Sequence, residues 1–311
     1  MRIVATAELP AVARETFASL GQIAVRDIDA RYALADAEVL IVRGAAIDEP
    51  ALARSPRLRA IARTGAGYDN LDVEAATARG IPIVYAPGVG SAPIAEGTVA
   101  LIFAATKRLR ELGAVVHGNA WHARYDVVGL DLDGTCIGIV GLGAIGRHVA
   151  RLSGALGMRV IAHDPALSPD AGAGVELVPL AELLDRAEVI SLHCALTDRT
   201  RGLVNRDFLA RVREGAVLVN VARGQIVESE EVLAEALESG RLAAVALDVF
   251  PSEPPPTDHR FYSNPRVVCT PHSVGLTARW NREVFASLAS GVSAVLAGRL
   301  PPNLLNPEAI G

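Results

Sequence analysis

The side chains best suited to chemistry stand at the carboxyl ends of three apolar runs in the second half of the sequence. Arg223 follows AVLVNVA, Asp248 lies near the end of LAAVALDV, and His272 follows RVVCTP. A guanidinium can grip a planar carboxylate with paired N–H donors, and an imidazole can exchange a proton near neutral pH. Glu253, in the proline-rich loop after Asp248, could hold the imidazole and favour its protonated form. Each residue alone could be an ordinary polar group, but their order favours the interconversion of a hydroxy acid and a keto acid.

A glycine-rich turn follows another apolar run, CIGIV. The turn reads GLGAIG over residues 141–146, and a helical pattern follows it. In such a turn the three glycines allow a tight bend, the approach of a pyrophosphate and close helix packing, and the helix N-terminus offers N–H groups to phosphates. Asp164 ends the next apolar run 23 residues after Gly141, near the roughly 20 expected for a carboxylate that binds the adenosine ribose. This carboxylate would repel a 2′-phosphate, so we expect NAD(H) to be preferred over NADP(H); a packing turn beside an exposed aspartate is the alternative.

Parallel sheets would position these residues. Short β-branched runs alternate with Ala-rich helical stretches, a pattern typical of doubly wound α/β sheets. Strands are expected at residues 2–5, 23–26, 39–43, 58–63 and 83–85, and again at 135–141, 159–164, 189–194, 216–221, 242–249 and 267–270. Helices are expected between them, with two longer ones at 93–117 and 277–297 and a loop at 121–133.

The position of the glycine-rich turn indicates two domains. A chain of 311 residues favours about two domains, and a lone Rossmann domain would carry its turn near its N-terminus rather than at residue 141. We expect an α/β protein with two doubly wound parallel-sheet domains: a Rossmann NAD-binding domain, residues 98–284, inserted in a flavodoxin-like substrate domain formed by residues 1–97 and 285–311. A cleft between such domains is the expected ligand site.

Composition narrows the class of protein. Thirty Lys and Arg against 35 Asp and Glu give a net charge of −5, which argues against nucleic acid as a partner. Apolar runs end well before the ~20 residues that a membrane span needs, and the first residues lack the features of a signal peptide, so a cytoplasmic location is expected. Each of the three cysteines lies in or at the end of an apolar run, where a free cysteine usually behaves as a small apolar residue. The sequence contains no metal-binding motif.

Several segments closely resemble the D-isomer-specific 2-hydroxyacid dehydrogenases, in particular the phosphoglycerate dehydrogenase and hydroxypyruvate/glyoxylate reductase branch. The most specific are GIVGLGAIG (138–146), NVARGQIVE (220–228), ALDVFPSEP (246–254) and TPHSVG (270–275). Weaker matches, ARTGAGYDNLD (62–72), YAPG (85–88) and NLLNPEA (303–309), extend the likeness over essentially the whole chain. The resemblance implies an NAD(H)-dependent enzyme that interconverts a small 2-keto acid and its D-2-hydroxy acid, and a homodimer.

The resemblance also assigns roles to matching residues. It implies that Arg223 binds the substrate carboxylate and polarises the carbonyl, that His272 is the acid/base, and that Glu253 is its partner. Asp248 would hold the nicotinamide carboxamide. The candidate cofactor contacts are Gly141, Gly143, Ala144, Ile145, Gly146, Asp164, Ala222 and Asp248. The candidate substrate contacts are Arg43, Ala66, Gly67 and Arg223.

Two positions leave the identity of the keto-acid substrate undetermined. Gly90 stands where the family usually has an asparagine, so an amide that could contact the substrate is missing. Arg43 matches a position that carries arginine in the phosphoglycerate dehydrogenase branch, where it could reach a phosphate or a second acid group, although a surface role is an equal alternative. Glyoxylate, hydroxypyruvate, phosphohydroxypyruvate and larger keto acids all satisfy the need for a carboxylate beside a carbonyl.

Three other functions are weighed against this one. Formate dehydrogenase resembles the same scaffold but has glutamine where Glu253 stands. A non-catalytic NAD-sensing interaction protein on this scaffold is the other alternative. The motif DLDGT at residues 131–135 resembles a phosphatase nucleophile, but it precedes a strand rather than ending one. That family also needs a downstream lysine, and the only lysine, Lys107, lies upstream.

Overall fold

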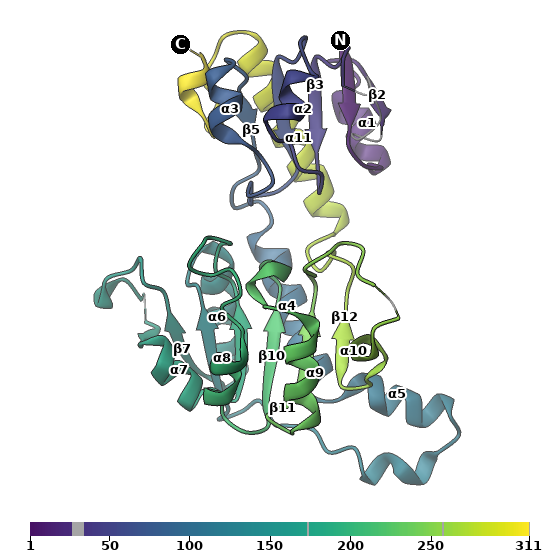
Figure 1. The fold of residues 1–311 in the computed structure, drawn as a ribbon, viewed down its shortest axis with the longest axis vertical. Coiled ribbons are helices and arrows are strands. Elements are labelled where there is room, and N and C mark those ends of the chain that lie inside the picture. Colours follow the sequence, from purple (N-terminus) through teal and green to yellow (C-terminus); the bar gives the residue numbers. More distant parts are fainter. Residues whose placement is uncertain (27–33, 173, 257, 311) are drawn as a thin grey trace. The chain divides into compact units, whose positions relative to one another are not determined.

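The protein folds into two compact units, each built on one parallel sheet (Figure 1). The computed structural model describes residues 1–26, 34–172, 174–256 and 258–310. Unit 1 comprises Met1–Gly90 and Leu276–Gly311, and unit 2 comprises Ser91–Gly275. The expected class, α/β with two doubly wound parallel sheets, is confirmed. No helix among the described residues has the length and apolar character needed to cross a membrane.

Unit 1 contains a five-stranded sheet in the order β2-β1-β3-β4-β5, which is the flavodoxin-like order. Its strands are β1 (Arg2–Ala5), β2 (Gln22–Val25), β3 (Val39–Val42), β4 (Ala60–Arg63) and β5 (Ile83–Val84). Helices α1 (Ala11–Phe17) and α11 (Ala278–Leu296) pack on one face, and α2 (Glu49–Ala53) and α3 (Val73–Ala78) pack on the other. The central strand VLIV is buried throughout, as expected for a parallel sheet covered on both faces.

Unit 2 contains a seven-stranded sheet in the order β12-β11-β10-β9-β6-β7-β8. Its strands are β6 (Cys136–Val140), β7 (Arg159–His163), β8 (Glu176–Leu177), β9 (Val189–Leu192), β10 (Ala216–Asn220), β11 (Leu242–Leu247) and β12 (Val267–Cys269). Helices α4 (Ser91–Thr106) and α6 (Ala144–Ala155) cover one face. Helices α7 (Leu180–Arg186), α8 (Arg206–Arg211) and α9 (Glu230–Glu238) cover the other. The unit also contains the helices α5 (Leu109–His117) and α10 (Arg260–Ser263).

The structure corrects the sequence-based expectation at three places. Strand β8 adds a seventh strand to the six expected in the second half; it pairs with β7 over only two residues, too few to give a β-branched pattern. The single helix expected at 93–117 is two helices, because Arg108 adopts a left-handed φ of 51° between α4 and α5. The expected loop at 121–133 contains a 3₁₀ helix, Trp121–Tyr125. The helix expected between residues 26 and 39 falls largely on residues 27–33, which lie outside the described residues.

Candidate active site

Three neighbouring strands of unit 2 deliver the candidate catalytic residues to one edge of the sheet. Arg223 follows β10, Glu253 lies in the loop after β11, and His272 follows β12. Strands β10, β11 and β12 are parallel and adjacent. Their carboxyl ends therefore meet at the same edge, which is where ligands bind in open α/β sheets.

The loop after β11 places Glu253 against His272. Glu253 Oε2 lies 2.8 Å from His272 Nδ1, and Glu253 Oε1 accepts a hydrogen bond from the Phe250 N–H at 3.1 Å. Burial acts to raise the pKa of the Glu253 carboxyl, but the hydrogen bond with His272 and the charges of His272 and Arg223 hold that pKa below its ordinary value. An ionised Glu253 accepts a hydrogen bond from Nδ1 and so orients the ring. His272 Nε2 makes no hydrogen bond to the described residues and is the nitrogen left for proton exchange.

The backbone of His272 adopts a conformation that is uncommon for any residue other than glycine. Its φ is 52°, in the left-handed region. The carboxylate of Asp248 is buried, with 3% of the residue exposed. It accepts hydrogen bonds from residues on both sides of His272 in the sequence. Oδ1 accepts from Thr270 Oγ1 at 2.7 Å, from Ser273 N at 2.7 Å and from Val274 N at 3.2 Å. Burial is the main cause of the raised pKa of Asp248, and these bonds offset it. Asp248 thus fixes the turn that carries the imidazole.

Arg223 is positioned by residues that the sequence analysis did not single out. Asn220, fully buried at the end of β10, accepts a hydrogen bond from Ala222 N at 3.0 Å and donates one to the Arg223 carbonyl at 2.9 Å. A Cβ on Gly224 would come within 1.8 Å of the Phe250 carbonyl carbon, so only glycine lets this turn pack on the loop after β11. The sole sequence clue to Asn220 was its place inside the segment NVARGQIVE.

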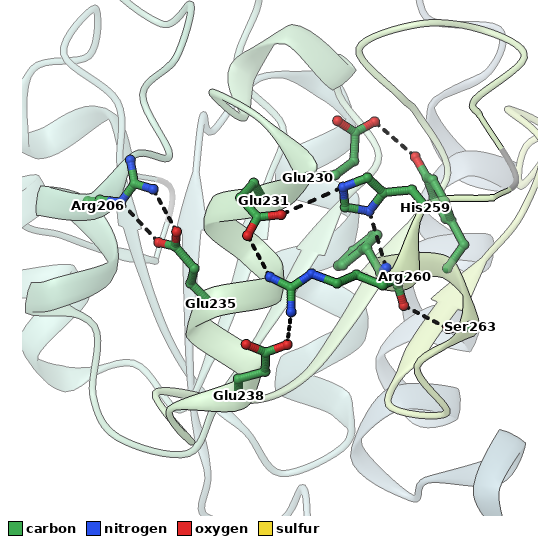
Figure 2. Close-up of polar contacts among 10 residues, drawn as sticks. Arg206, Glu230, Glu231, Glu235, Glu238, His259, Arg260 and Ser263 are labelled. Atoms are coloured by element: carbon green, nitrogen blue, oxygen red, sulfur yellow. Dashed lines mark hydrogen bonds and ion pairs between the residues drawn. The ribbon is translucent and has the colours of Figure 1, made fainter.

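Helix α10, which follows the loop that carries Glu253, forms ion pairs with α9. Figure 2 shows the Arg260 guanidinium of α10 between two carboxylates of α9, Glu231 and Glu238. The ring of His259 lies 3.7 Å from Glu231 and caps the start of α10. No motif or spacing in the sequence marks this cluster, which joins segments about 30 residues apart. The cluster joins α10 to α9.

The glycine-rich turn lies at the topological switch point of the sheet, where β6 pairs with both β7 and β9. Gly141 has a φ of 95°, and a Cβ there would lie 2.6 Å from Cys194 N. A Cβ on Gly146 would lie 2.2 Å from the Gly141 carbonyl oxygen. In contrast, a Cβ on the exposed Gly143, the N-cap of α6, would have no atom of the described residues within 4 Å apart from its chain neighbours and its own helix backbone. The fold requires the first and third glycines, while the space over the second is open to a phosphate group at the helix N-terminus.

Asp164 is held beside this turn. Its Oδ2 accepts a hydrogen bond from Leu142 N at 2.9 Å, and its Oδ1 accepts one from Ala166 N at 3.0 Å. Ala144 and Ile145 form the first turn of α6. These placements fit a dinucleotide whose pyrophosphate meets the α6 N-terminus and whose ribose meets the carboxylate.

The candidate substrate contacts of unit 1 are organised by one further arginine. Arg63, at the end of β4, donates from Nε to the Gly67 carbonyl at 2.8 Å and from Nη1 to the Arg43 carbonyl at 2.6 Å. Arg63 therefore links the loops that follow β3 and β4. Ala66 is exposed, and the guanidinium of Arg43 makes no hydrogen bond or ion pair within the described part of the chain. Arg63 was missed by the sequence analysis.

Known proteins place this chain in a family. Residues 99–274 match the model of "D-isomer specific 2-hydroxyacid dehydrogenase, NAD binding domain". The D-3-phosphoglycerate dehydrogenase of Mycobacterium leprae is 39% identical over 307 residues, 96% of this chain and 58% of that protein. The glyoxylate reductase of Korarchaeum cryptofilum is 36% identical over 269 residues, 85% of this chain and 81% of that protein. The crystal structure of TT0316 protein from Thermus thermophilus is 36% identical, with a TM-score of 0.89 over 98% of this chain and 100% of that one.

The lengths of these relatives differ from that of this chain. The chain spans 52–58% of the length of the D-3-phosphoglycerate dehydrogenases that it matches. The match of residues 99–274 covers the glycine-rich turn and all three strand-end residues, so the family resemblance of the sequence motifs is confirmed. The chain belongs to the D-isomer-specific 2-hydroxyacid dehydrogenase family.

Proposed function

We propose that this chain is an NAD(H)-dependent oxidoreductase that interconverts a small 2-keto acid and the corresponding D-2-hydroxy acid. The observation that carries the proposal is the 2.8 Å contact between His272 and Glu253. Arg223 follows β10, which lies in the same sheet as β11 and β12, and the glycine-rich turn lies in the same unit. A paired imidazole beside a cation is what a reaction needs when it moves a proton to or from an oxygen next to a carboxylate.

The proposed roles follow from the chemistry of each group. When bound, NADH supplies the hydride for C2 of the keto acid. Arg223 grips the substrate carboxylate and polarises the carbonyl. In the reductive direction His272 donates a proton from Nε2 to the carbonyl oxygen, and in the oxidative direction it accepts the hydroxyl proton. Glu253 keeps the ring oriented and stabilises its protonated form.

The proposed cofactor contacts are those that line the glycine-rich turn and the neighbouring strand ends. They are Gly141, Gly143, Ala144, Ile145, Gly146, Asp164, Ala222 and Asp248. Among the described residues, Asp248 Oδ1 accepts from three donors, whereas Oδ2 accepts a single bond of 3.4 Å from Val274 N. Oδ2 is therefore the oxygen of Asp248 proposed to accept a bond from the nicotinamide carboxamide. Unit 1 is proposed to contribute Arg43, Ala66 and Gly67 to substrate binding.

The test of the proposed function is NADH oxidation with a panel of 2-keto acids. The panel holds glyoxylate, hydroxypyruvate, phosphohydroxypyruvate and larger keto acids, and the Arg43→Gln variant is measured beside the natural chain. Turnover of at least one member supports the proposal, and a selective loss of phosphohydroxypyruvate turnover in Arg43→Gln identifies Arg43 as a phosphate contact. Tight NADH binding without any turnover would instead favour a non-catalytic NAD-sensing protein. In a parallel assay with formate and NAD⁺, formation of NADH without turnover of any keto acid would favour formate dehydrogenase.

Asp164 is expected to set the cofactor preference. In Asp164→Ala the carboxylate that repels a 2′-phosphate is gone, so the ratio of kcat/KM for NADH to that for NADPH should fall by about tenfold or more, equivalent to ~1.4 kcal/mol. The ratio is measured with the best keto acid. The control is Asp207→Ala, an exposed aspartate in the first turn of α8, which should leave the ratio unchanged. An unaltered ratio in Asp164→Ala would count against the assignment.

We propose that the chain forms a homodimer through residues 107–131 of unit 2, which are called the arm. None of these residues is buried, although they form α5 and a 3₁₀ helix (Figure 1), and a helix as short as α5 is marginal alone in water. The arm exposes large apolar side chains by 53–74%: Leu109, Val116, Trp121, Tyr125 and Val128. Its basic and acidic residues nearly balance, so two copies can meet without strong repulsion. Its length matches the roughly 20–30 residues that each partner gives to a standard interface.

The mass in solution tests this dimer. Light scattering coupled to size exclusion is expected to give twice the chain mass of 32.5 kDa for the natural chain. The double variant Trp121→Ser and Tyr125→Ser should shift toward the single-chain mass, because two exposed aromatic anchors of the interface are lost. The control is Leu300→Ser, which alters an apolar side chain of unit 1 that is 65% exposed and should leave the mass unchanged. A natural chain that runs at the single-chain mass would refute the dimer.

A further inference from the structure

Thr270 makes three hydrogen bonds at the start of the turn that carries His272. Its N–H donates to the Leu247 carbonyl at 2.9 Å, and its carbonyl accepts from the His272 N–H at 3.0 Å. Its hydroxyl Oγ1 donates to Asp248 Oδ1 at 2.7 Å. The two backbone bonds are open to almost any residue at this position. Only the third bond depends on a hydroxyl.

The hydroxyl is the one side-chain donor to Asp248 within the described part of the chain; the other donors are the backbone N–H groups of Ser273 and Val274. Asp248 is 3% exposed, and a buried carboxylate stays ionised only while hydrogen bonds replace its hydration. Without the hydroxyl, the carboxylate loses one of its two shortest bonds. It then either takes up a proton or turns away, and in both cases it holds Ser273 N and Val274 N less well.

The turn depends on these bonds because of its backbone conformation. His272 is one of three described residues other than glycine with a positive φ, and such a conformation persists only where the surroundings fix it. The donors to Asp248 come from residues 270, 273 and 274, so they bracket His272 from both sides. The contact of its ring with Glu253 at 2.8 Å follows from this placement.

We infer that Thr270 is a positioning residue whose hydroxyl holds the Asp248 carboxylate under the His272 turn and so keeps the imidazole aligned with Glu253 for proton exchange. The inference rests on the proposed function for its catalytic consequence. It does not depend on that function for the geometry of the turn.

The charged groups around the imidazole give the inference a second consequence. Glu253 contacts the ring from the loop after β11, the charges of Asp248 and His272 interact, and the charge of Arg223, in the turn after β10, acts on Glu253. If Asp248 is neutral or turned away, the charge and the hydrogen bonds around the ring change. The spectroscopic signals of the ring should change with them.

Two substitutions separate the hydroxyl from the methyl group. Thr270→Val keeps the shape and removes the hydroxyl, while Thr270→Ser keeps the hydroxyl and removes the methyl. We expect Thr270→Val to lower kcat by about tenfold and to change KM for the keto acid by less than about twofold, because the proposed contact of Arg223 with the substrate carboxylate is kept. Thr270→Ser should keep kcat within about twofold of the natural chain. A pure packing role predicts the reverse order, with Thr270→Ser the poorer enzyme, and that result overturns the inference.

A measurement without turnover tests the geometry on its own. The ring signals of His272 are recorded by NMR in the cofactor-free protein and assigned by their absence in His272→Asn. The inference predicts that these signals move in Thr270→Val and match the natural chain in Thr270→Ser. Unmoved ring signals in Thr270→Val overturn it. If the natural chain reduces no keto acid while the ring signals behave as expected, the proposed function fails and the positioning role of Thr270 stands.

Discussion

His272→Asn is expected to lower kcat for keto-acid reduction by about 10²–10⁴-fold, the usual contribution of a general acid or base. Asparagine suits the test because it tolerates the left-handed backbone conformation better than most residues, and His272 has a φ of 52°. The turn should therefore survive while the titratable ring is lost. KM for the keto acid should change far less than kcat, because the proposed contact of Arg223 with the carboxylate is kept.

The pH dependence of the same variant adds a sign that can be checked. Reduction consumes a proton, so the rate of the natural chain should fall as pH rises through the range where His272 loses its proton. Glu253 stays ionised there, since its pKa lies below the ordinary value. The His272→Asn variant should lose this dependence and keep only a low, flat rate.

The matched control for this variant is His259→Asn. His259 caps α10 through its ring and lies near Glu231, and asparagine is itself a favourable N-cap residue. This substitution should leave kcat within about twofold, because the cap is retained and His259 lies outside the proposed catalytic set. Retention of more than about a tenth of the natural turnover by His272→Asn would remove His272 from the mechanism.

Arg223→Gln is expected to have the second large effect, a loss of about 10³-fold in kcat/KM for the keto acid. Two charge-assisted hydrogen bonds to a carboxylate contribute about 2 kcal/mol each, and ~4 kcal/mol corresponds to about 10³-fold. We expect kcat to fall and KM for the keto acid to rise, because the same cation is proposed to bind the carboxylate and to polarise the carbonyl. Arg223→Lys keeps the charge but loses the planar guanidinium, so its kcat/KM should lie between those of the natural chain and Arg223→Gln.

Binding of NADH separates this prediction from a collapse of the site. The Kd for NADH, measured by its fluorescence, should stay within about threefold in Arg223→Gln, because the proposed pyrophosphate contacts lie at the glycine-rich turn. Arg213→Gln is the control: Arg213 is about half-exposed and pairs with Glu188, and this substitution should not change kcat/KM. A kcat/KM within tenfold of the natural value, or a loss of NADH binding in its place, would contradict the role given to Arg223.

Periodicity and strand order predicted most of the fold. Apolar runs such as VLIV and CIGIV are fully buried strands, because both faces of a parallel sheet are covered. The placement of Arg223, Glu253 and His272 at one sheet edge followed from the same logic. What periodicity could not show is β8, which spans two residues, or the break at Arg108, which no glycine or proline marks.

The residues that hold the site in place were beyond sequence reasoning. Asn220 acts on the turn that follows it, Arg63 links loops after two strands, and Thr270 meets a carboxylate 22 residues away. Such bonds join segments through side-chain geometry and leave no repeating pattern in the sequence. The roles of the candidate catalytic and binding residues stay predictions, and the contacts of Glu253 and Asp248 are what support them.

The most direct measurement of the central claim follows the hydride itself. The chain is incubated with NADH that carries deuterium in place of the transferable hydrogen at C4, together with the keto acid that the panel ranks first, and the product is analysed by mass spectrometry and chiral chromatography. A chiral product such as glycerate from hydroxypyruvate is preferred. We expect one deuterium at C2 of a hydroxy acid of D configuration. A product without deuterium, or one of L configuration, would contradict the proposed function.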